Sequence, residues 1–167
     1  MKYKIILLVA ILATIARANI LVIAIEEKKL PYELSPKNYD LSSANYDNSV
    51  SNYDNSPSNY DNSSSNYDNS PSNYDNTVNG DRSILVEEEK KLIHYGYYIT
   101  NKEGLTNFYS PKGKRLFYSP KGSMGLYHGT KGFFCGAIAK VQGKIRLALT
   151  EQGQRVLLLG EWYEPGR

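Results

Sequence analysis

The chain has 167 residues and a formal net charge of +3 at pH 7, and 41% of its residues are hydrophobic. This length accommodates one ordinary domain, or one small domain with additional segments. Residues 26–81 carry three Lys against ten acidic residues, whereas residues 82–167 carry fourteen basic against seven acidic residues. The single cysteine, Cys135, excludes an intramolecular disulfide, and one Cys with two His is too few for a structural zinc site.

The first segment, residues 1–18, has the features of a secretory signal peptide. Lys2 and Lys4 precede a short uncharged apolar run, and the small-x-small sequence Ala16-Arg17-Ala18 follows it. We therefore expect an exported protein, periplasmic or secreted, with cleavage after Ala18.

A membrane anchor over residues 5–25 is the alternative, because a second apolar run covers residues 20–25. Together the two runs span 21 residues, which is long enough to cross a bilayer. The anchor would place Arg17 inside the membrane, at a cost of about 2.5–3.5 kcal/mol near its centre, so the cleaved signal is favoured.

Residues 19–37 are expected to connect this segment to an array of seven-residue repeats over residues 38–78. The array has one tyrosine per repeat, always within Asn-Tyr-Asp, at Tyr39, Tyr46, Tyr53, Tyr60, Tyr67 and Tyr74. A coiled coil needs two apolar positions per heptad, a strand would send successive tyrosines to opposite faces, and a solenoid would need more apolar residues. The array is therefore predicted to be disordered, a flexible tether with a root-mean-square span of roughly 35 Å.

The array has similar sequences on its two flanks, "ILVIAIEEKKL" at 20–30 and "ILVEEEKKL" at 84–92. Chance can explain this similarity, and so can a duplication that brackets an expanded repeat. Under the second interpretation the fold beyond the array does not depend on it. The tyrosines could also bind a partner through many weak contacts, or the acidic array could fold back over the basic end.

Residues 83–167 form the expected folded domain. Residues 83–95 begin with a possible helix, capped by Ser83 and supported by a Glu87–Lys91 pair, and residues 92–100 are typical of a strand. Two copies of Phe-Tyr-Ser-Pro-Lys-Gly, at 108–113 and 117–122, each predict a strand end followed by a β-turn.

Three further strands are predicted at 125–128, 133–141 and 144–150. Residues 150–159 fit either a helix capped by Thr150 or a buried strand, and the strand is favoured because Gly153 weakens a helix. Turns every 8–12 residues favour a mainly β fold, a small antiparallel meander or a partly open barrel, with one short helix as an option.

An enzymatic site has one weak set of candidates, Cys135 with His128 or His94. A thiol nucleophile needs a nearby base and an environment that lowers its pKa. Cys135 follows two phenylalanines in an apolar strand, where a buried and inert thiol is usual. We therefore expect no catalytic site, no metal site and no cofactor.

A basic and aromatic stretch gives the predicted binding residues, Tyr109, Lys112, Lys114, Arg115, Tyr118 and Lys121. Cations beside aromatic rings are typical of nucleic-acid binding, but an exported protein rarely meets nucleic acid. An anionic surface polymer, lipid headgroups or a protein partner are the expected ligands. The sequence thus predicts a non-catalytic, envelope-associated binding module on a flexible tether, with a small enzyme or enzyme inhibitor, or a membrane-anchored tether, as alternatives.

Overall fold

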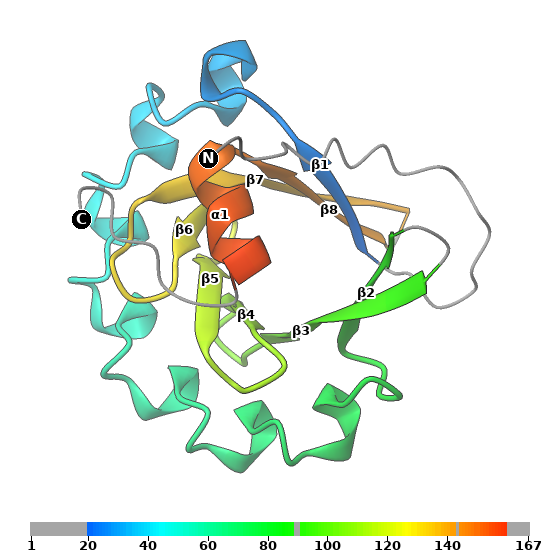
Figure 1. Ribbon diagram of the computed structural model, residues 1–167. Coiled ribbons are helices and arrows are strands. Elements are labelled where there is room, and N and C mark those ends of the chain that lie inside the picture. Colours follow the sequence, from blue (N-terminus) through cyan, green and yellow to red (C-terminus); the bar gives the residue numbers. More distant parts are fainter. Residues whose placement is uncertain (1–19, 89–90, 143, 160–167) are drawn as a thin grey trace.

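The computed structural model describes residues 20–88, 91–142 and 144–159, so the predicted signal peptide lies outside the described residues. The described residues form eight strands and one α-helix (Figure 1). The strands and the helix are β1 (Ile20–Ala24), β2 (Ser83–Glu88), β3 (Lys91–Thr100), β4 (Thr106–Tyr109), β5 (Arg115–Ser119), β6 (Gly125–His128), β7 (Phe134–Val141), β8 (Lys144–Leu149) and α1 (Glu151–Leu159).

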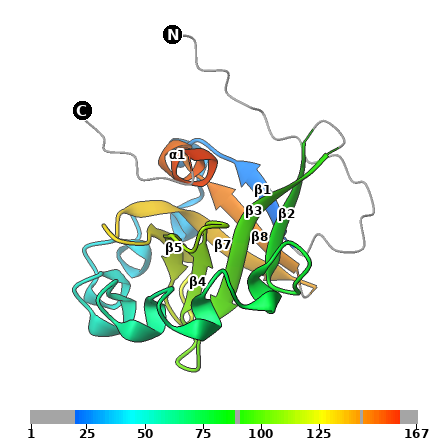
Figure 2. The same ribbon diagram turned by 60° about the horizontal axis from the view of Figure 1, so that its bottom comes forward.

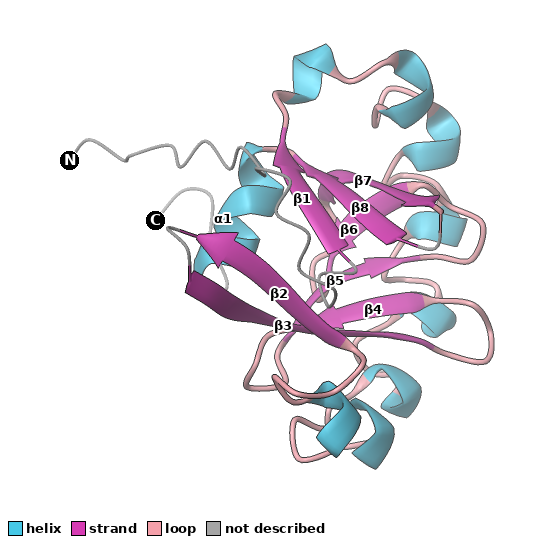
Figure 3. Cartoon of the chain, turned by 90° about the vertical axis from the view of Figure 1, so that its right-hand side faces the viewer, coloured by secondary structure: helices cyan, strands magenta, loops and turns pink. Residues whose placement is uncertain are grey.

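All eight strands form one sheet in the order β1-β8-β7-β6-β5-β4-β3-β2. Strands β2 to β8 pair antiparallel with their neighbours in chain order, and β1 pairs parallel with β8. The two edge strands, β1 and β2, lie beside each other, so the sheet is nearly closed into a barrel (Figure 3). The predicted mainly β fold, a meander or partly open barrel, is confirmed.

The inside of the barrel holds the main hydrophobic core. Its buried side chains come from both edge strands, from the meander and from α1, which closes one end of the barrel through Val156 and Leu157 (Figure 2). Ile20 and Val22 of β1 belong to this core, together with Ile84 of β2. The two similar flanking sequences therefore form the two edge strands, and residues 20–24 are part of the sheet rather than a connecting segment.

The two Ser-Pro-Lys-Gly segments form the predicted turns between strands. In the first, the amide of Gly113 donates to the carbonyl of Ser110 at 2.9 Å. Gly113 and Gly122 have φ angles of +83° and +73°, a backbone region that favours glycine. The two turns predicted from the Ser-Pro-Lys-Gly sequences are therefore confirmed.

Two local predictions are wrong. Ser83 begins strand β2 instead of capping a helix, and its hydroxyl donates to the carbonyl of Gly80 at 2.7 Å. Residues 151–159 are a helix instead of a strand, and the hydroxyl of Thr150 caps it by accepting from the amide of Gly153 at 3.3 Å. Gly153 lets this helix approach β7 closely, because a Cβ atom there would lie 2.2 Å from the carbonyl oxygen of Cys135.

The predicted disorder of the array is also wrong. A 3-10 turn begins at every seventh residue from Tyr32 to Tyr74, preceded by a separate turn at Glu27–Lys29 (η1). We call residues 32–76 the repeat belt, because they curve around the outside of β6, β5, β4 and β3 (Figure 1). Its turns are η2 (Tyr32–Leu34), η3 (Tyr39–Leu41), η4 (Tyr46–Asn48), η5 (Tyr53–Asn55), η6 (Tyr60–Asn62), η7 (Tyr67–Asn69) and η8 (Tyr74–Asn76).

Candidate binding surface

Each unit of the repeat belt from η3 to η7 is held by two local side-chain hydrogen bonds. In the unit of η6, Asn59 Oδ1 accepts a hydrogen bond from the amide of Asp61 at 3.0 Å, and Ser63 Oγ accepts one from the amide of Ser65 at 3.1 Å. Asn and Ser side chains commonly stabilise turns in this way. The Asn, Asp and Ser residues that disfavour a helix or a strand therefore favour a series of short turns.

The second Asn of each unit joins that unit to the preceding one. Asn62 Nδ2 donates to the carbonyl of Asp54 at 2.8 Å and to that of Ser56 at 2.9 Å. The same pair of bonds recurs in every unit from η4 to η8. These side chains are only 1–3% exposed, namely Asn48, Asn55, Asn62, Asn69 and Asn76. A ladder of amide groups thus replaces the apolar core that a solenoid normally needs.

The outer face of the barrel supplies a hydrogen-bond donor to each of five successive units, and a second donor, Asn107, to the unit of η6. Tyr109 Oη donates to the carbonyl of Asn62 at 3.1 Å, and Tyr97 Oη donates to that of Asn69 at 2.6 Å. The remaining three bonds run from Tyr127 to Leu41 at 2.9 Å, from Tyr118 to Asn48 at 2.6 Å and from Arg115 to Asn55 at 2.8 Å. The belt is therefore part of the fold. This disagrees with the interpretation that the domain after the array folds independently of it.

Arg115 occupies the centre of this contact. Its Nε donates to Asn107 Oδ1 at 2.7 Å, and its guanidinium carbon lies 4.7 Å from the ring centre of Tyr118. Burial lowers the pKa of Arg115 to about 10, and no carboxylate of the described residues forms a salt bridge with it. Carbonyl oxygens and tyrosine rings take the place of a counter-ion, which ties this side chain to the belt.

The structure separates the predicted binding residues into two groups. Tyr109, Arg115 and Tyr118 are buried and bind the repeat belt, so they are not on the surface. The three lysines, Lys112, Lys114 and Lys121, are exposed on turns beside the belt. Three of the six residues thus contact a segment of the same chain.

The enzymatic candidates have separate structural roles. Cys135 belongs to the inner core, where burial raises the pKa of its thiol. His128 is also buried, and its Nδ1 lies 3.2 Å from the amide of Thr130 and 3.1 Å from that of Lys131, from which it accepts hydrogen bonds. Burial, together with nearby lysines, lowers the pKa of His128 to about 4. These surroundings suit a packed thiol and a turn-stabilising imidazole better than a nucleophile and its base. His94, the other candidate base, lies on β3.

The outward side of the repeat belt carries a regular row of tyrosines, which we call the tyrosine ladder. Each of its rings is 59–67% exposed, and all lie at the same position of their unit. The ladder consists of Tyr32, Tyr39, Tyr46, Tyr53, Tyr60, Tyr67 and Tyr74. In six of the seven units the next residue is an exposed aspartate, and in the first it is Glu33. Sequence spacing identified six of these tyrosines, all but Tyr32, but it did not predict that they lie on an ordered surface.

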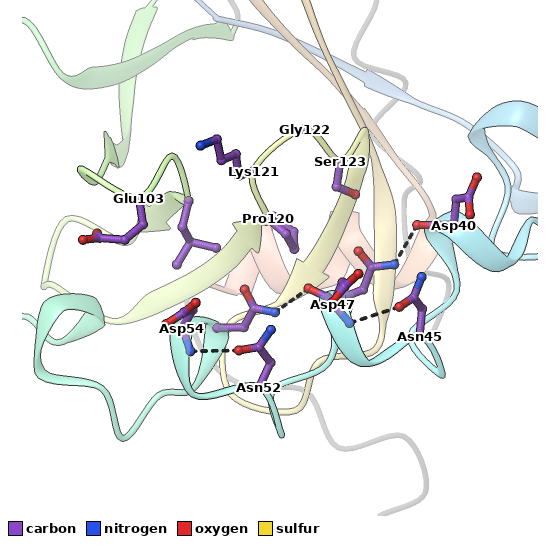
Figure 4. A pocket seen from close by; sticks show the side chains of 13 residues that line it. Asp40, Asn45, Asp47, Asn52, Asp54, Glu103, Pro120, Lys121, Gly122 and Ser123 are labelled. Carbon is purple, nitrogen blue, oxygen red and sulfur yellow. Dashed lines mark hydrogen bonds between the residues drawn. The ribbon is translucent and has the colours of Figure 1, made fainter.

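A groove of about 360 Å³ lies between the repeat belt and two turns of the barrel (Figure 4). Asp40, Asp47 and Asp54 line its belt side, and Glu103 and Lys121 line the opposite side (Figure 4). Within the described ranges, no group of three or more His, Cys, Asp or Glu side chains is placed to hold a metal ion.

Comparisons of the chain with protein family models, with curated proteins and with solved structures give no match. In the part of the chain that the structure describes, no helix has the length and apolar character needed to span a membrane.

Proposed function

We propose that this protein is an exported, non-catalytic binding module whose ligand-contacting surface is the tyrosine ladder. The observation that carries the proposal is the regular exposure of one aromatic ring per unit. The first residue of the turn is an exposed tyrosine in all seven units, whereas the third is leucine in the first two units and a buried asparagine in the last five. The amide ladder explains the buried asparagines by their place in the fold, whereas a row of exposed aromatic rings points to contact with a ligand.

Export is supported by the position of the first strand. Cleavage after Ala18 would leave β1, which begins at Ile20, intact with its pairing to β8. A membrane anchor would have to exclude the residues of β1, which leaves residues 5–19, fewer than the roughly 20 that a spanning helix needs. A buried Cys135 also suits an oxidising compartment, because the thiol is not available for intermolecular disulfides.

The proposal is tested by co-sedimentation of the full chain with an insoluble cell-envelope fraction of the source organism. The test variant replaces Tyr46, Tyr53, Tyr60 and Tyr67 by serine, a change confined to exposed side chains. We expect the wild-type chain to sediment and the variant to bind at least about ten-fold more weakly, because each lost ring removes about 0.5–1.5 kcal/mol of contact.

The matched control replaces the exposed lysines of the turns, Lys112, Lys114 and Lys121, by serine. This control should bind as the wild-type chain does. A wild-type chain that stays in the supernatant, or a control that loses binding while the tyrosine variant keeps it, would contradict the proposal. Circular dichroism of all three proteins separates a loss of binding from a loss of fold.

A further inference from the structure

We propose that the ligand of the tyrosine ladder is a linear, uncharged polysaccharide that lies along the repeat belt. This inference rests on the proposed function, because it names the ligand class of the same surface. Three properties of the described residues support it: the regular spacing of the units, the residues that surround each ring, and the mixed charge along the belt.

The barrel holds successive units of the belt from neighbouring strands, except that the units of η4 and η5 are both held from β5. Tyr97 and Tyr109 hold two successive units, and their ring centres are 5.2 Å apart. Tyr118 and Tyr127 hold another successive pair, with ring centres 5.5 Å apart. Because neighbouring strands lie about 4.8 Å apart, the belt advances close to one strand per unit at these pairs. A surface with such a repeat fits a ligand that is itself a chain of identical units.

The surroundings of each ring resemble a sugar-binding surface more than a protein interface. Tyr60 is followed by the exposed Asp61 and, four residues later, by the exposed Ser65. The same pair recurs after Tyr46, Tyr53 and Tyr67, so these four rings stand among acceptors and hydroxyl groups. The centres of protein interfaces are enriched in Tyr but depleted in Asp and Ser. A pyranose ring has an apolar C–H face that can pack on tyrosine, and hydroxyl groups that can donate to carboxylates.

The charge along the belt favours a neutral ligand over a charged one. Exposed aspartates run along the belt, and these repel nucleic acid and other polyanions. The β4–β5 turn packs against the belt, since a Cβ atom at Gly113 would lie 2.9 Å from Pro71. This turn carries the exposed Lys112 and Lys114, and Lys121 lines the groove on the side opposite Asp47. A polycation placed along the belt would therefore meet lysines on both flanks.

The first experiment measures binding of the full chain to insoluble cellulose, chitin, β-1,3-glucan and mannan, with polylysine-coated beads as the cationic polypeptide probe. We expect binding to at least one polysaccharide and at least about ten-fold weaker binding of the variant with serine at positions 46, 53, 60 and 67. Binding should change less than about two-fold between about 0.05 and 0.5 M salt, because the ligand carries no charge. Capture only by polylysine would overturn the inference.

A second experiment tests the polysaccharide ligand separately from the proposed binding function. The envelope fraction is treated either with protease or with a mixture of cellulase, chitinase, β-1,3-glucanase and mannanase, and co-sedimentation is then repeated. We expect the glycosidase mixture to abolish binding and protease to leave it unchanged. Loss of binding after protease alone identifies a protein ligand, which overturns the polysaccharide but leaves the binding module intact. No binding to the untreated fraction contradicts the proposed function itself.

Discussion

Each belt unit from η4 to η8 contains three Asx residues with three different tasks. The first Asn accepts a hydrogen bond at the start of the turn, the Asp faces solvent, and the second Asn donates two hydrogen bonds to the preceding unit. Only an amide can perform the third task, because a carboxylate has no N–H group to offer two carbonyl oxygens. The first two units have leucine at this position, and there Leu41 packs in an apolar cluster with Tyr127.

Replacement of Asn62 by aspartate tests this task without changing the size of the side chain. Two donors to carbonyl oxygens become acceptors, and the variant places a charge at a site that is 2% exposed. We expect the free energy of unfolding to fall by about 3 kcal/mol or more, as measured by urea denaturation at neutral pH. The reverse change at the exposed neighbour, Asp61→Asn, should stay within about 0.5 kcal/mol of wild type. Equal stability of the two variants would contradict the amide ladder.

At the residue scale, three of the six predicted binding residues contact the chain's own repeat belt, a partner that the sequence offered only as an alternative. Tyr109, Arg115 and Tyr118 stand out because rings alternate with cations, and all three do bind a chain. Turn chemistry predicts where a strand ends, but it does not predict what covers the face of the sheet. The partner of Tyr118 is 70 residues away in the sequence, beyond the reach of any local pattern.

At the element scale, predictions succeeded where the deciding contacts are local. The Ser-Pro-Lys-Gly turns carry their own dihedral preferences, and the strands between them followed. Helix α1 was assigned to a strand because Gly153 disfavours a helix when the segment is considered alone. In the fold the same glycine is needed for the close contact with the carbonyl of Cys135. The sequence predicts disorder for the belt for a similar reason. The side chains of the barrel that donate hydrogen bonds to the belt lie on strands that follow it in the sequence, so a local pattern does not include them.

Deletion of one unit, residues 59–65, distinguishes an ordered belt from a flexible tether by the sign of its effect. Shortening a flexible connection leaves stability unchanged or raises it slightly, because a shorter loop costs less entropy to close. Shortening the belt removes the contacts of Asn62 with Tyr109 and Asn107 and puts the other units out of register with the strands. We expect a loss of about 3 kcal/mol or more in urea denaturation.

A control variant keeps the length and composition of residues 59–65 but scrambles their order. It should also be destabilised, because the turn caps and the amide ladder depend on position. A deletion variant as stable as wild type would show that this part of the chain is a tether.

At the scale of the whole molecule, the repeat belt joins the two edge strands of the barrel. It leaves the sheet after β1, passes around the outside of β6 to β3, and returns to the sheet at β2 (Figure 1). Four of the bonds that hold it are donated by buried tyrosine hydroxyls, and others come from Arg115 and Asn107. The attachment of the belt therefore depends on these hydroxyls keeping their protons.

Stability should consequently decrease at alkaline pH. Burial raises the pKa of Tyr127 from its ordinary 10 to about 12, and it raises the pKa of Tyr97, Tyr109 and Tyr118 as well. A folded-state pKa above the unfolded value stabilises the protein fully below pH 10, and this contribution is lost as pH rises from 10 toward 12 and beyond. Urea denaturation at a series of pH values above 9 measures this dependence.

The variant Tyr127→Phe lacks one of these hydroxyl groups and is the matched comparison. At neutral pH it should be about 1 kcal/mol less stable, because the carbonyl of Leu41 loses its donor. Its stability should also fall less steeply with pH than that of the wild-type chain. Identical slopes would show that these tyrosines do not control the attachment of the belt.

The long sequence separation between the belt and its donors has a consequence for biosynthesis. Because the chain is made from its N-terminus, Leu41 emerges 86 residues before the tyrosine that binds its carbonyl, and every belt unit likewise precedes its strand. The belt must therefore remain soluble and unpaired until β3 to β6 have formed. A sequence rich in Asn, Ser and Asp, interrupted by Pro57 and Pro71, has a low tendency to aggregate, so the belt can remain soluble until the strands have formed.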